Sequence, residues 1–232
     1  MEFDLTLAEF FTSAQEVVLC RRHGRCGEDP DNHRAEKSDI YRLIESSLKL
    51  RQLDFASCAF RFGKLFARLS AKRFYHHEGY VCRFFYLNGR YRDVRPDGPS
   101  QQELELAQVA TFVIDQYFQE PSLGIRLYYV CLSPELCDNP ILERKVVRAP
   151  KWNAERVKRI IEDRLHKLST AVSLADESLP ECSLEERFGS AFNPYRKCRD
   201  FCRARFHCHQ YASSRVDLAA TDGILLNDGH VV

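Results

Sequence analysis

Three cysteines lie close together near the end of the sequence, as Cys198-x3-Cys202-x5-Cys208, and Cys182 precedes them in Leu-Pro-Glu-Cys-Ser. Residues 177–211 lack regular apolar periodicity, so this segment has little means of building a core of its own. Thiolates are soft ligands for zinc and for iron–sulfur clusters, and a bound metal supplies local folding energy. The spacing therefore predicts a metal site, with reduced cysteines that bind nothing as the alternative.

Histidines widen the choice of ligands. His207 and His209 flank Cys208 and could replace a thiolate if the metal is zinc. A second group of Cys and His residues occupies a stretch rich in Gly, Asp, Asn and Pro, with the members Cys20, His23, Cys26 and His33. Loops often carry stray residues of these types, so we interpret this second group as incidental.

Basic residues gather in two stretches although the net charge of the chain is only +1. Residues 58–96 hold nine basic and two acidic residues, a local charge of +7. Residues 195–208 hold five basic residues and one acid, a local charge of +4, which leaves −10 for the rest. An acidic body with two basic patches favours a polyanionic partner.

Residues 57–74 are expected to form a helix, because their apolar residues recur at helical spacing. Cations three and four positions apart would project from one face of that helix: Arg61, Lys64, Arg68 and Lys72. None of them has an acidic residue at i+3 or i+4, so the like charges repel unless a polyanion is bound. The pattern predicts nucleic-acid binding, with an ordinary solvated surface as the alternative.

A β-hairpin is expected next, with strands at 80–86 and 90–95 around Asn88-Gly89, because Asn-Gly accepts the positive φ values of a tight turn. Several arginines lie on or beside it: Arg83, Arg90, Arg92 and Arg95. Five aromatic residues accompany them in the same stretch. Arginines among aromatic rings suit phosphate binding combined with base stacking.

Composition excludes several classes of protein. The chain has 232 residues, of which 44% are hydrophobic and 29% charged, a balance that rules out wholesale disorder and collagen-like structure. No apolar run approaches the ~20 residues of a membrane span. The start, MEFDLTLAEFF, lacks a basic region followed by an apolar core. We therefore expect an intracellular protein without a membrane partner, in the cytoplasm or in the nucleus of a host cell.

The remaining elements complete an α/β pattern. Helices are expected at 6–20, where Thr6 and Glu9 form a capping box, at 35–53, at 100–118 and from Asn153, and strands at 124–132 and 142–147. The order helix, hairpin, helix, strands, helix predicts an α/β core rather than a bundle or a sandwich. We expect a helical N-terminal segment, the α/β core, a cysteine-rich metal-binding segment and a tail, at 1–56, 57–176, 177–211 and 212–232.

Several stretches resemble RecB-like PD-(D/E)XK nucleases, notably Arg-Ile-Ile-Glu-Asp-Arg-Leu, Leu-Pro-Glu-Cys-Ser-Leu-Glu-Glu-Arg-Phe and Lys-Cys-Arg-Asp-Phe-Cys-Arg-Ala-Arg-Phe-His-Cys-His-Gln-Tyr. The branch most similar is the phage and CRISPR-associated exonucleases with a cysteine-bound [4Fe–4S] cluster. The resemblance covers 57–211 and implies a restriction-endonuclease-like core. It also implies a cluster on Cys182, Cys198, Cys202 and Cys208, with zinc as the alternative metal and Cys20 or Cys26 as the substitute for Cys182.

The resemblance breaks down at the catalytic positions. In such nucleases two acids hold Mg²⁺ or Mn²⁺ and a lysine activates water. Carried over, the first acid falls at Cys82, the second at Asp93 and the lysine at Arg95, while an upstream histidine falls near Ala67. Only Asp93 matches. Gln108-Val-Ala-Thr-Phe112 is similar to the family's helix motif, a glutamine followed four positions later by a tyrosine.

Cysteine is a poor ligand for magnesium, and arginine stays protonated at working pH. We therefore expect a catalytically inactive pseudo-nuclease that binds DNA, or RNA, through its basic residues and Gln108. One alternative is an active Mg- or Mn-dependent DNA exonuclease, either with its catalytic residues at other positions than this alignment gives or with Glu78 and a neighbouring lysine in the missing roles. Another is an interaction subunit of a phage, viral or nucleic-acid-processing complex.

Overall fold

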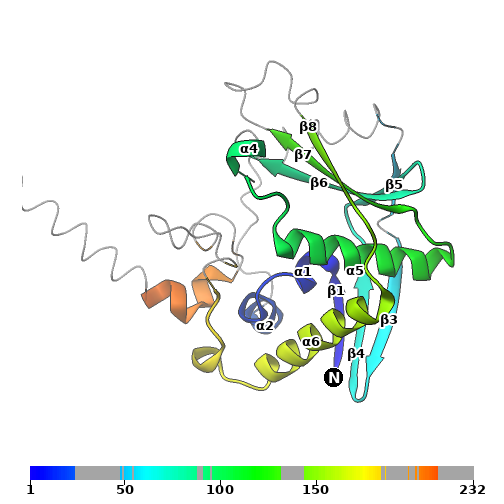
Figure 1. Ribbon diagram of the computed structural model, residues 1–232. Helices are drawn as coiled ribbons and strands as arrows, with labels where there is room; N and C mark the ends of the chain where they lie inside the picture. The colour runs from blue at the N-terminus through cyan, green and yellow to red at the C-terminus, as the bar shows by residue number, and fades with distance from the viewer. Residues whose placement is uncertain are drawn as a thin grey trace, which may run out of the picture. The chain divides into compact units, whose positions relative to one another are not determined.

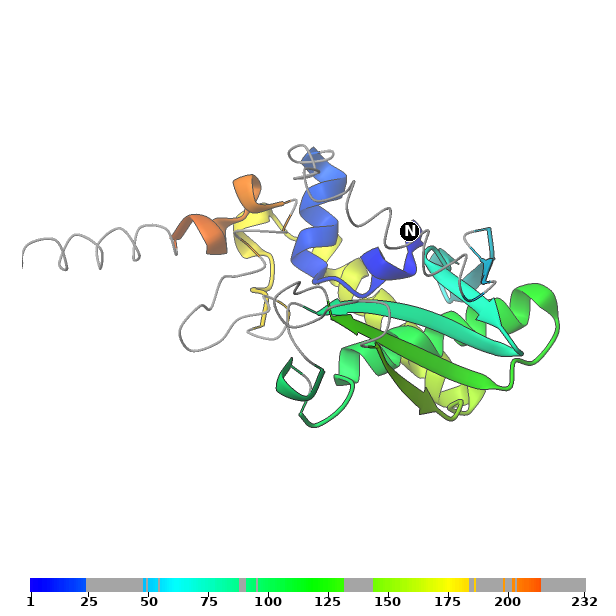
Figure 2. The same cartoon turned by 90° about the horizontal axis from the view of Figure 1, so that it is seen from above.

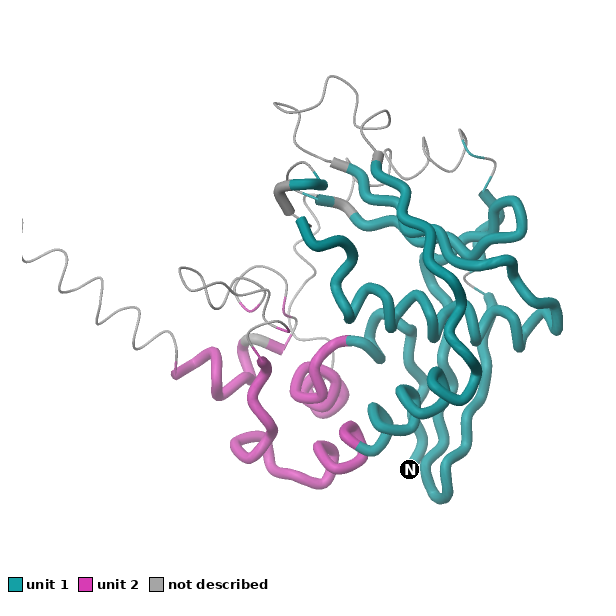
Figure 3. The backbone as a smooth tube through the Cα atoms, viewed as in Figure 1, with its two compact units in different colours: residues 1–11, 33–166 teal, residues 12–32, 167–232 magenta. Residues whose placement is uncertain are grey.

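The computed structural model describes residues 1–23, 48, 50–53, 55–87, 91–94, 96–131, 144–183, 186, 198, 202 and 204–213. Within them the protein is a mixed α/β structure with two mixed sheets and several helices (Figure 1). The chain divides into two compact units, one of residues 1–11 and 33–166 and one of residues 12–32 and 167–232 (Figure 3). Each unit therefore combines segments that lie far apart in the sequence.

The smaller sheet of the first unit has the order β1-β4-β3, with β1 (Glu2–Thr6), β3 (Ser57–Phe62) and β4 (Leu65–Ser70). The strands β1 and β4 are parallel, and β3 and β4 form an antiparallel hairpin. Alternate residues of β4 are buried, which is the pattern of a strand with one covered face. The helix expected over 57–74 is therefore wrong.

The larger sheet has the order β2-β5-β6-β7-β8. Its strands are β2 (Arg51–Gln52), β5 (Phe74–His77), β6 (Tyr80–Leu87), β7 (Gly124–Cys131) and β8 (Arg144–Ala149). Among the described pairs of this sheet only β6–β7 is parallel, and both of its strands have neighbours on either side (Figure 2). The strands expected at 80–86, 124–132 and 142–147 are confirmed over their described residues, and β8 ends two residues beyond the expected end.

The hairpin expected between residues 80–86 and 90–95 is wrong. Residues 91–94 form a short helix, α4 (Tyr91–Val94), in place of the second strand of the expected hairpin. The hairpin partner of β6 is β5, and the two are joined by Glu78 and Gly79, which both have positive φ values, of 49° and 80°. Two consecutive positive φ values are typical of the tight turn whose twist matches paired strands.

The helix α5 (Gln101–Phe118) lies between the two sheets (Figure 1). Its Ala107 packs with Leu127 and Tyr129 of the larger sheet, and Phe112 stacks on Phe60 of β3 with ring centroids 6.1 Å apart. Ser100 caps the helix, because its hydroxyl accepts the Glu103 N–H while the Glu103 carboxylate accepts the Ser100 N–H. The helix expected at 100–118 is confirmed.

The N-terminal segment was expected to be helical, but it also contains a strand. It begins with β1, and the capping box of Thr6 and Glu9 is present but starts only the short helix α1 (Leu7–Phe10). A second helix, α2 (Ala14–His23), follows in the second unit. Most of the helix expected at 35–53 lies outside the described residues, and its end at Arg51–Gln52 is a strand.

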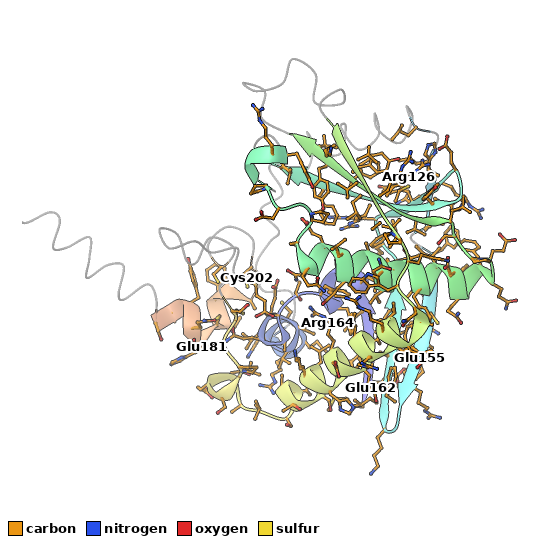
Figure 4. The ribbon with its side chains drawn as sticks, viewed as in Figure 1. Arg126, Glu155, Glu162, Arg164, Glu181 and Cys202 are labelled. Atoms are coloured by element: carbon orange, nitrogen blue, oxygen red, sulfur yellow. The ribbon has the colours of Figure 1, made fainter. Side chains whose placement is uncertain are left out.

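The helix α6 (Ala154–Val172) begins where the sequence indicates, with the Asn153 side chain accepting the Arg156 N–H at 2.8 Å. Arg164 of this helix fixes it to the rest of the first unit (Figure 4). Its guanidinium donates to the Phe10 carbonyl, lies 4.2 Å from the centroid of the Phe11 ring and approaches Glu105 of α5. One arginine thus links α1, α5 and α6.

Candidate functional site

The four cysteines expected to hold a metal line one pocket of the second unit (Cys202 is labelled in Figure 4). The opposite wall of the pocket comes from α2, through Gln15, Glu16 and Leu19. Cys198 and Cys208 are each 6% exposed, and Cys182 and Cys202 are half-buried. The structure therefore brings together thiols up to 26 positions apart in the sequence, beside a helix from the other end of the chain.

Cys182 has a defined polar environment. Its Sγ lies 3.0 Å from the Ser13 hydroxyl and 3.1 Å from the Gln15 side-chain oxygen. Its backbone N–H donates to the Gln210 side-chain oxygen at 3.0 Å. Burial raises the pKa of the Cys182 thiol to about 11, so the thiol is protonated at neutral pH unless a cation offsets its charge.

Burial also raises the pKa of the Cys208 thiol, whose sulfur accepts a long hydrogen bond of 3.4 Å from the Tyr211 N–H. The residues that the structure describes include no group of three or more Cys, His, Asp or Glu side chains in an arrangement that could hold a metal ion. The thiol pocket, lined by Cys182, Cys198, Cys202 and Cys208, therefore has the donor types of a zinc or iron–sulfur site without the closed ligand geometry.

In the second Cys and His group, which comprises Cys20, His23, Cys26 and His33, the two described residues have different contacts. Cys20 packs against the apolar cluster around Leu19 and Cys208. The His23 Nε2 lies 2.6 Å from an Asp176 carboxylate oxygen, and its ring stacks on that of His207 at 4.2 Å between centroids. His209 is exposed. Cys26 and His33 lie outside the described residues.

Cys82, where the resemblance places the first catalytic acid, is completely buried in the larger sheet. It lies opposite Tyr75 on β5 and Arg126 on β7. Phe84 stacks on Tyr128 at 4.7 Å and meets Tyr75 edge to face at 5.5 Å. Burial raises the pKa of the Cys82 thiol to about 12, so this position holds a neutral sulfur among aromatic rings.

The charged residues nearest to Cys82 form an ion pair. An Arg126 guanidinium nitrogen lies 2.8 Å from a Glu78 carboxylate oxygen, and the guanidinium carbon lies 3.9 Å from the centroid of the Tyr80 ring. The hydrogen bond from Arg126 holds the pKa of the Glu78 carboxyl below its usual range. Arg126 was missed in the sequence, although an arginine inside the apolar strand Gly124–Cys131 (Figure 4) is a signal of a specific partner.

The other catalytic positions are only partly described. Asp93 lies in α4 rather than on a strand, and its side chain is outside the described part of the structure. Arg95 and Arg90 also lie outside it. Arg92 is exposed on α4. Ala67, where the resemblance places a histidine, is completely buried in β4.

The four cations expected on one helix face lie instead on a hairpin and two turns. Arg61 and Arg68 are exposed on β3 and β4, and Lys64 and Lys72 are exposed in the turns that follow these strands. Arg68 pairs in register with Asp4 of the neighbouring strand β1. Arg68 therefore has an acidic neighbour across the strands, which the i+3 and i+4 positions of a helix do not reveal.

Arg83 is held within the first unit. Its guanidinium donates to the carbonyls of Lys72 and Arg73, at 3.2 and 2.7 Å, and lies 4.9 Å from the centroid of the Phe74 ring. These contacts join β6 to the turn between β4 and β5. The described geometry thus gives Arg83 a positioning role.

Gln108 is 2% exposed in the middle of α5. Its amide nitrogen donates to the Pro150 carbonyl at 2.9 Å, and its oxygen accepts the Trp152 N–H at 2.9 Å. The side chain therefore fixes the connection between β8 and α6. An open pocket lies beside it, and an ion pair of Asp115 and Lys151 at 2.9 Å lines that pocket.

Comparisons with known proteins give a likeness of fold alone. No family model matches the chain, and no curated protein matches it. A solved structure described as "Crystal structure of SSO0001" superposes with a TM-score of 0.50 at 8% identity, over 70% of this chain and 75% of that one. None of the described helices is long and apolar enough to cross a membrane. The chain thus shares a mixed α/β fold with a distant solved structure.

Proposed function

We propose that this chain is a nucleic-acid-binding protein on a RecB-like nuclease scaffold, that it lacks nuclease chemistry, and that a metal at the thiol pocket stabilises its second unit. The observation that carries the proposal is the environment of Cys82. A magnesium-dependent nuclease needs oxygen ligands at such a position. Here the side chain is a buried thiol packed with Tyr75, Phe84 and Tyr128.

The ion pair beside Cys82 adds to this argument. Glu78 is the acid that could replace a missing catalytic carboxylate, but its carboxylate is bound by Arg126. A cation at that place repels Mg²⁺ and competes with it for the carboxylate. Asp93 would then stand without the second acid that a two-carboxylate metal site requires.

Nucleic-acid binding is supported by the charge distribution. The stretch 58–96 keeps its local charge of +7 whatever its secondary structure, and the structure places Arg61, Lys64, Lys72 and Arg73 on the surface of the first unit. Exposed cations of this kind bind phosphates with little regard to sequence. We expect DNA as the partner, with RNA as a second polymer of the same chemistry.

A metal at the thiol pocket is supported by the donor set. Four thiols with no disulfide among them line one small pocket, and burial raises the pKa of two of them, Cys182 and Cys208. A bound [4Fe–4S] cluster or zinc ion would offset the thiolate charges. It would also cross-link the segments around Cys182 and around residues 198–208, whose apolar cluster is small. Of the two thiols that could substitute for Cys182, Cys20 lies in the described part of the chain. It packs against the apolar cluster that contains Leu19 and Cys208.

The nucleic-acid part of the proposal is tested with labelled single-stranded DNA incubated with the purified chain and Mg²⁺ or Mn²⁺. We expect binding that weakens as salt rises, and no degradation. Degradation that disappears in Asp93→Ala would overturn the inactive assignment in favour of a metal-dependent exonuclease. Absence of binding at low salt would favour an interaction subunit instead.

The metal is tested by its colour and its content. A brown protein with absorbance near roughly 400 nm is expected for an iron–sulfur cluster, whereas a colourless protein with stoichiometric zinc indicates the alternative metal. Cys198→Ser combined with Cys202→Ser should remove the metal. The matched control is Cys58→Ser, since Cys58 lies on β3 in the first unit. Metal content that survives the double substitution would contradict the assigned ligands.

A further inference from the structure

Three aromatic rings meet at the surface of the first unit, where α5 ends. The ring centroids of Phe55 and Tyr117 are 5.8 Å apart, those of Phe55 and Phe118 are 6.0 Å apart, and those of Tyr117 and Phe118 are 5.1 Å apart. All three pairs meet edge to face. Phe55 is 53% exposed and Tyr117 is 45% exposed, so the aromatic platform of Phe55, Tyr117 and Phe118 presents ring surface to solvent.

Both sides of the platform are held in place by backbone structure. Tyr117 and Phe118 form the last turn of α5, which ends at Gln119 with a φ of 56°. Phe55 lies in a loop whose ends are tied down, since the Leu53 N–H donates to the Phe74 carbonyl and the Ala56 carbonyl accepts the Ala71 N–H, each at 2.9 Å. Rings held in this way lose little entropy when they bind a ligand.

One cation contacts the platform, and two others lie on a neighbouring turn. The Arg51 guanidinium lies over the Phe118 ring, 5.2 Å from its centroid. The turn to which the Phe55 loop is hydrogen-bonded carries Lys72 and Arg73, and both of these side chains are exposed. Of the acids closest along the chain, Asp115 is paired with Lys151. The others are Asp54, which precedes Phe55 in the sequence, and Glu120, which is exposed two residues beyond Phe118. The three cations thus outnumber these two acids.

We propose that the platform of Phe55, Tyr117 and Phe118 stacks the bases of single-stranded nucleic acid while Arg51, Lys72 and Arg73 contact its phosphates. This assignment rests on the proposed nucleic-acid binding and gives it a place in the fold. Unpaired bases expose flat π faces that stack on aromatic side chains, whereas duplex bases are already stacked on one another. The combination of exposed rings and cations fits a polyanion with flat apolar bases better than it fits an apolar protein partner.

The test uses a fluorescent 15-nucleotide oligothymidine and an abasic chain of the same length, which keeps the phosphates and lacks the bases. Wild-type protein should bind oligothymidine more tightly than the abasic chain at low salt. The double variant Phe55→Leu, Tyr117→Leu removes two rings and keeps apolar bulk. We expect it to bind oligothymidine about tenfold more weakly and the abasic chain unchanged.

The matched control is Phe206→Leu, which removes a ring that is 66% exposed in the second unit. This variant should keep the preference for oligothymidine. Far-UV circular dichroism checks that the double variant folds. Oligothymidine binding that survives the double substitution, or an equal loss for both polymers, would overturn the stacking platform and leave nucleic-acid binding in place. Binding of neither polymer by the wild type would overturn both proposals.

Discussion

At the scale of single residues, buried polar side chains such as Gln108 and Glu103 form hydrogen bonds with backbone groups. Gln108 bridges a carbonyl and an N–H of the connection between β8 and α6. The Glu103 carboxylate serves the cap of α5 and also accepts the Tyr129 hydroxyl at 3.0 Å. Such groups are costly to leave unpaired, so their substitution affects stability before it affects binding.

Gln108→Leu should lower the free energy of unfolding by about 1–3 kcal/mol, because it leaves the Pro150 carbonyl and the Trp152 N–H without their partner. Urea denaturation measures the loss, and the affinity of the folded variant for DNA should stay at the wild-type value. Gln116→Leu, on the exposed face of the same helix, is the control and should change neither quantity. Normal stability with weakened DNA binding would instead assign Gln108 to the interface.

The sequence indicates the right residue types at the thiol pocket and misses the residues around Cys82. Cysteine spacing is a local signal, so it identifies thiols that line one pocket. The contact of Arg126 with Glu78 joins residues 48 positions apart, and it depends on the pairing of β6 with β7 and on the turn that holds Glu78. Phe55 meets Tyr117 in the same way, through long-range packing that no local pattern encodes.

At the scale of elements, helix starts marked by capping boxes are predicted correctly from the sequence, whereas short apolar stretches are not. The two capping boxes are local in sequence and both are present. Residues 57–74 satisfy two patterns at once. Phe62, Leu65, Phe66 and Leu69 recur at helical spacing, whereas Leu65, Ala67 and Leu69 alternate as in a strand with one buried face. Short apolar runs fit both periods, and tertiary pairing decides between them. The φ of 58° at Gly63 marks the turn that separates the two strands.

The last turn of α2 is held to the rest of the second unit by ion pairs and hydrogen bonds. Arg22 and His23 both bind the Asp176 carboxylate, and Arg22 also donates to the Val172 carbonyl at 2.8 Å. The hydrogen bond from His23, followed by the one from Arg22, lowers the pKa of the Asp176 carboxyl. A carboxyl whose pKa is lowered by folding stabilises the folded state when ionised.

Asp176→Asn should therefore lower the free energy of unfolding by about 0.5–1 kcal/mol at pH 7. This difference from wild type should be complete above the ordinary carboxyl pKa of about 3.9 and should fade as pH falls through the lowered value. Urea denaturation at several pH values gives the comparison. Glu177→Gln, at the exposed acid next along the chain, is the control. A difference that stays the same in strong acid, where the carboxyl is protonated in both states, would contradict the assigned cause.

At the scale of the whole molecule, the two units are built on different physical principles. The first unit has two sheets that share the helix α5 and contains most of the large buried side chains. The second combines α2 with the cysteine-rich segment around a small apolar cluster of Val18, Leu19, Ala171, Leu179, Ala204 and Cys208. The expected division into consecutive segments could not anticipate that residues 12–32 join residues 167–232, because this pairing is set by tertiary packing.

A metal at the thiol pocket should therefore stabilise the second unit selectively. The chain has one tryptophan, Trp152, and it belongs to the first unit, so its fluorescence reports that unit alone, whereas far-UV circular dichroism reports both. Cys202→Ser with Cys208→Ser should lower a circular-dichroism melting transition by about 10 °C or more and leave the Trp152 transition in place. Cys58→Ser, in the first unit, controls for loss of a thiol elsewhere. If the two probes shift together, the units unfold as one cooperative body, and the metal would then be stabilising the whole chain.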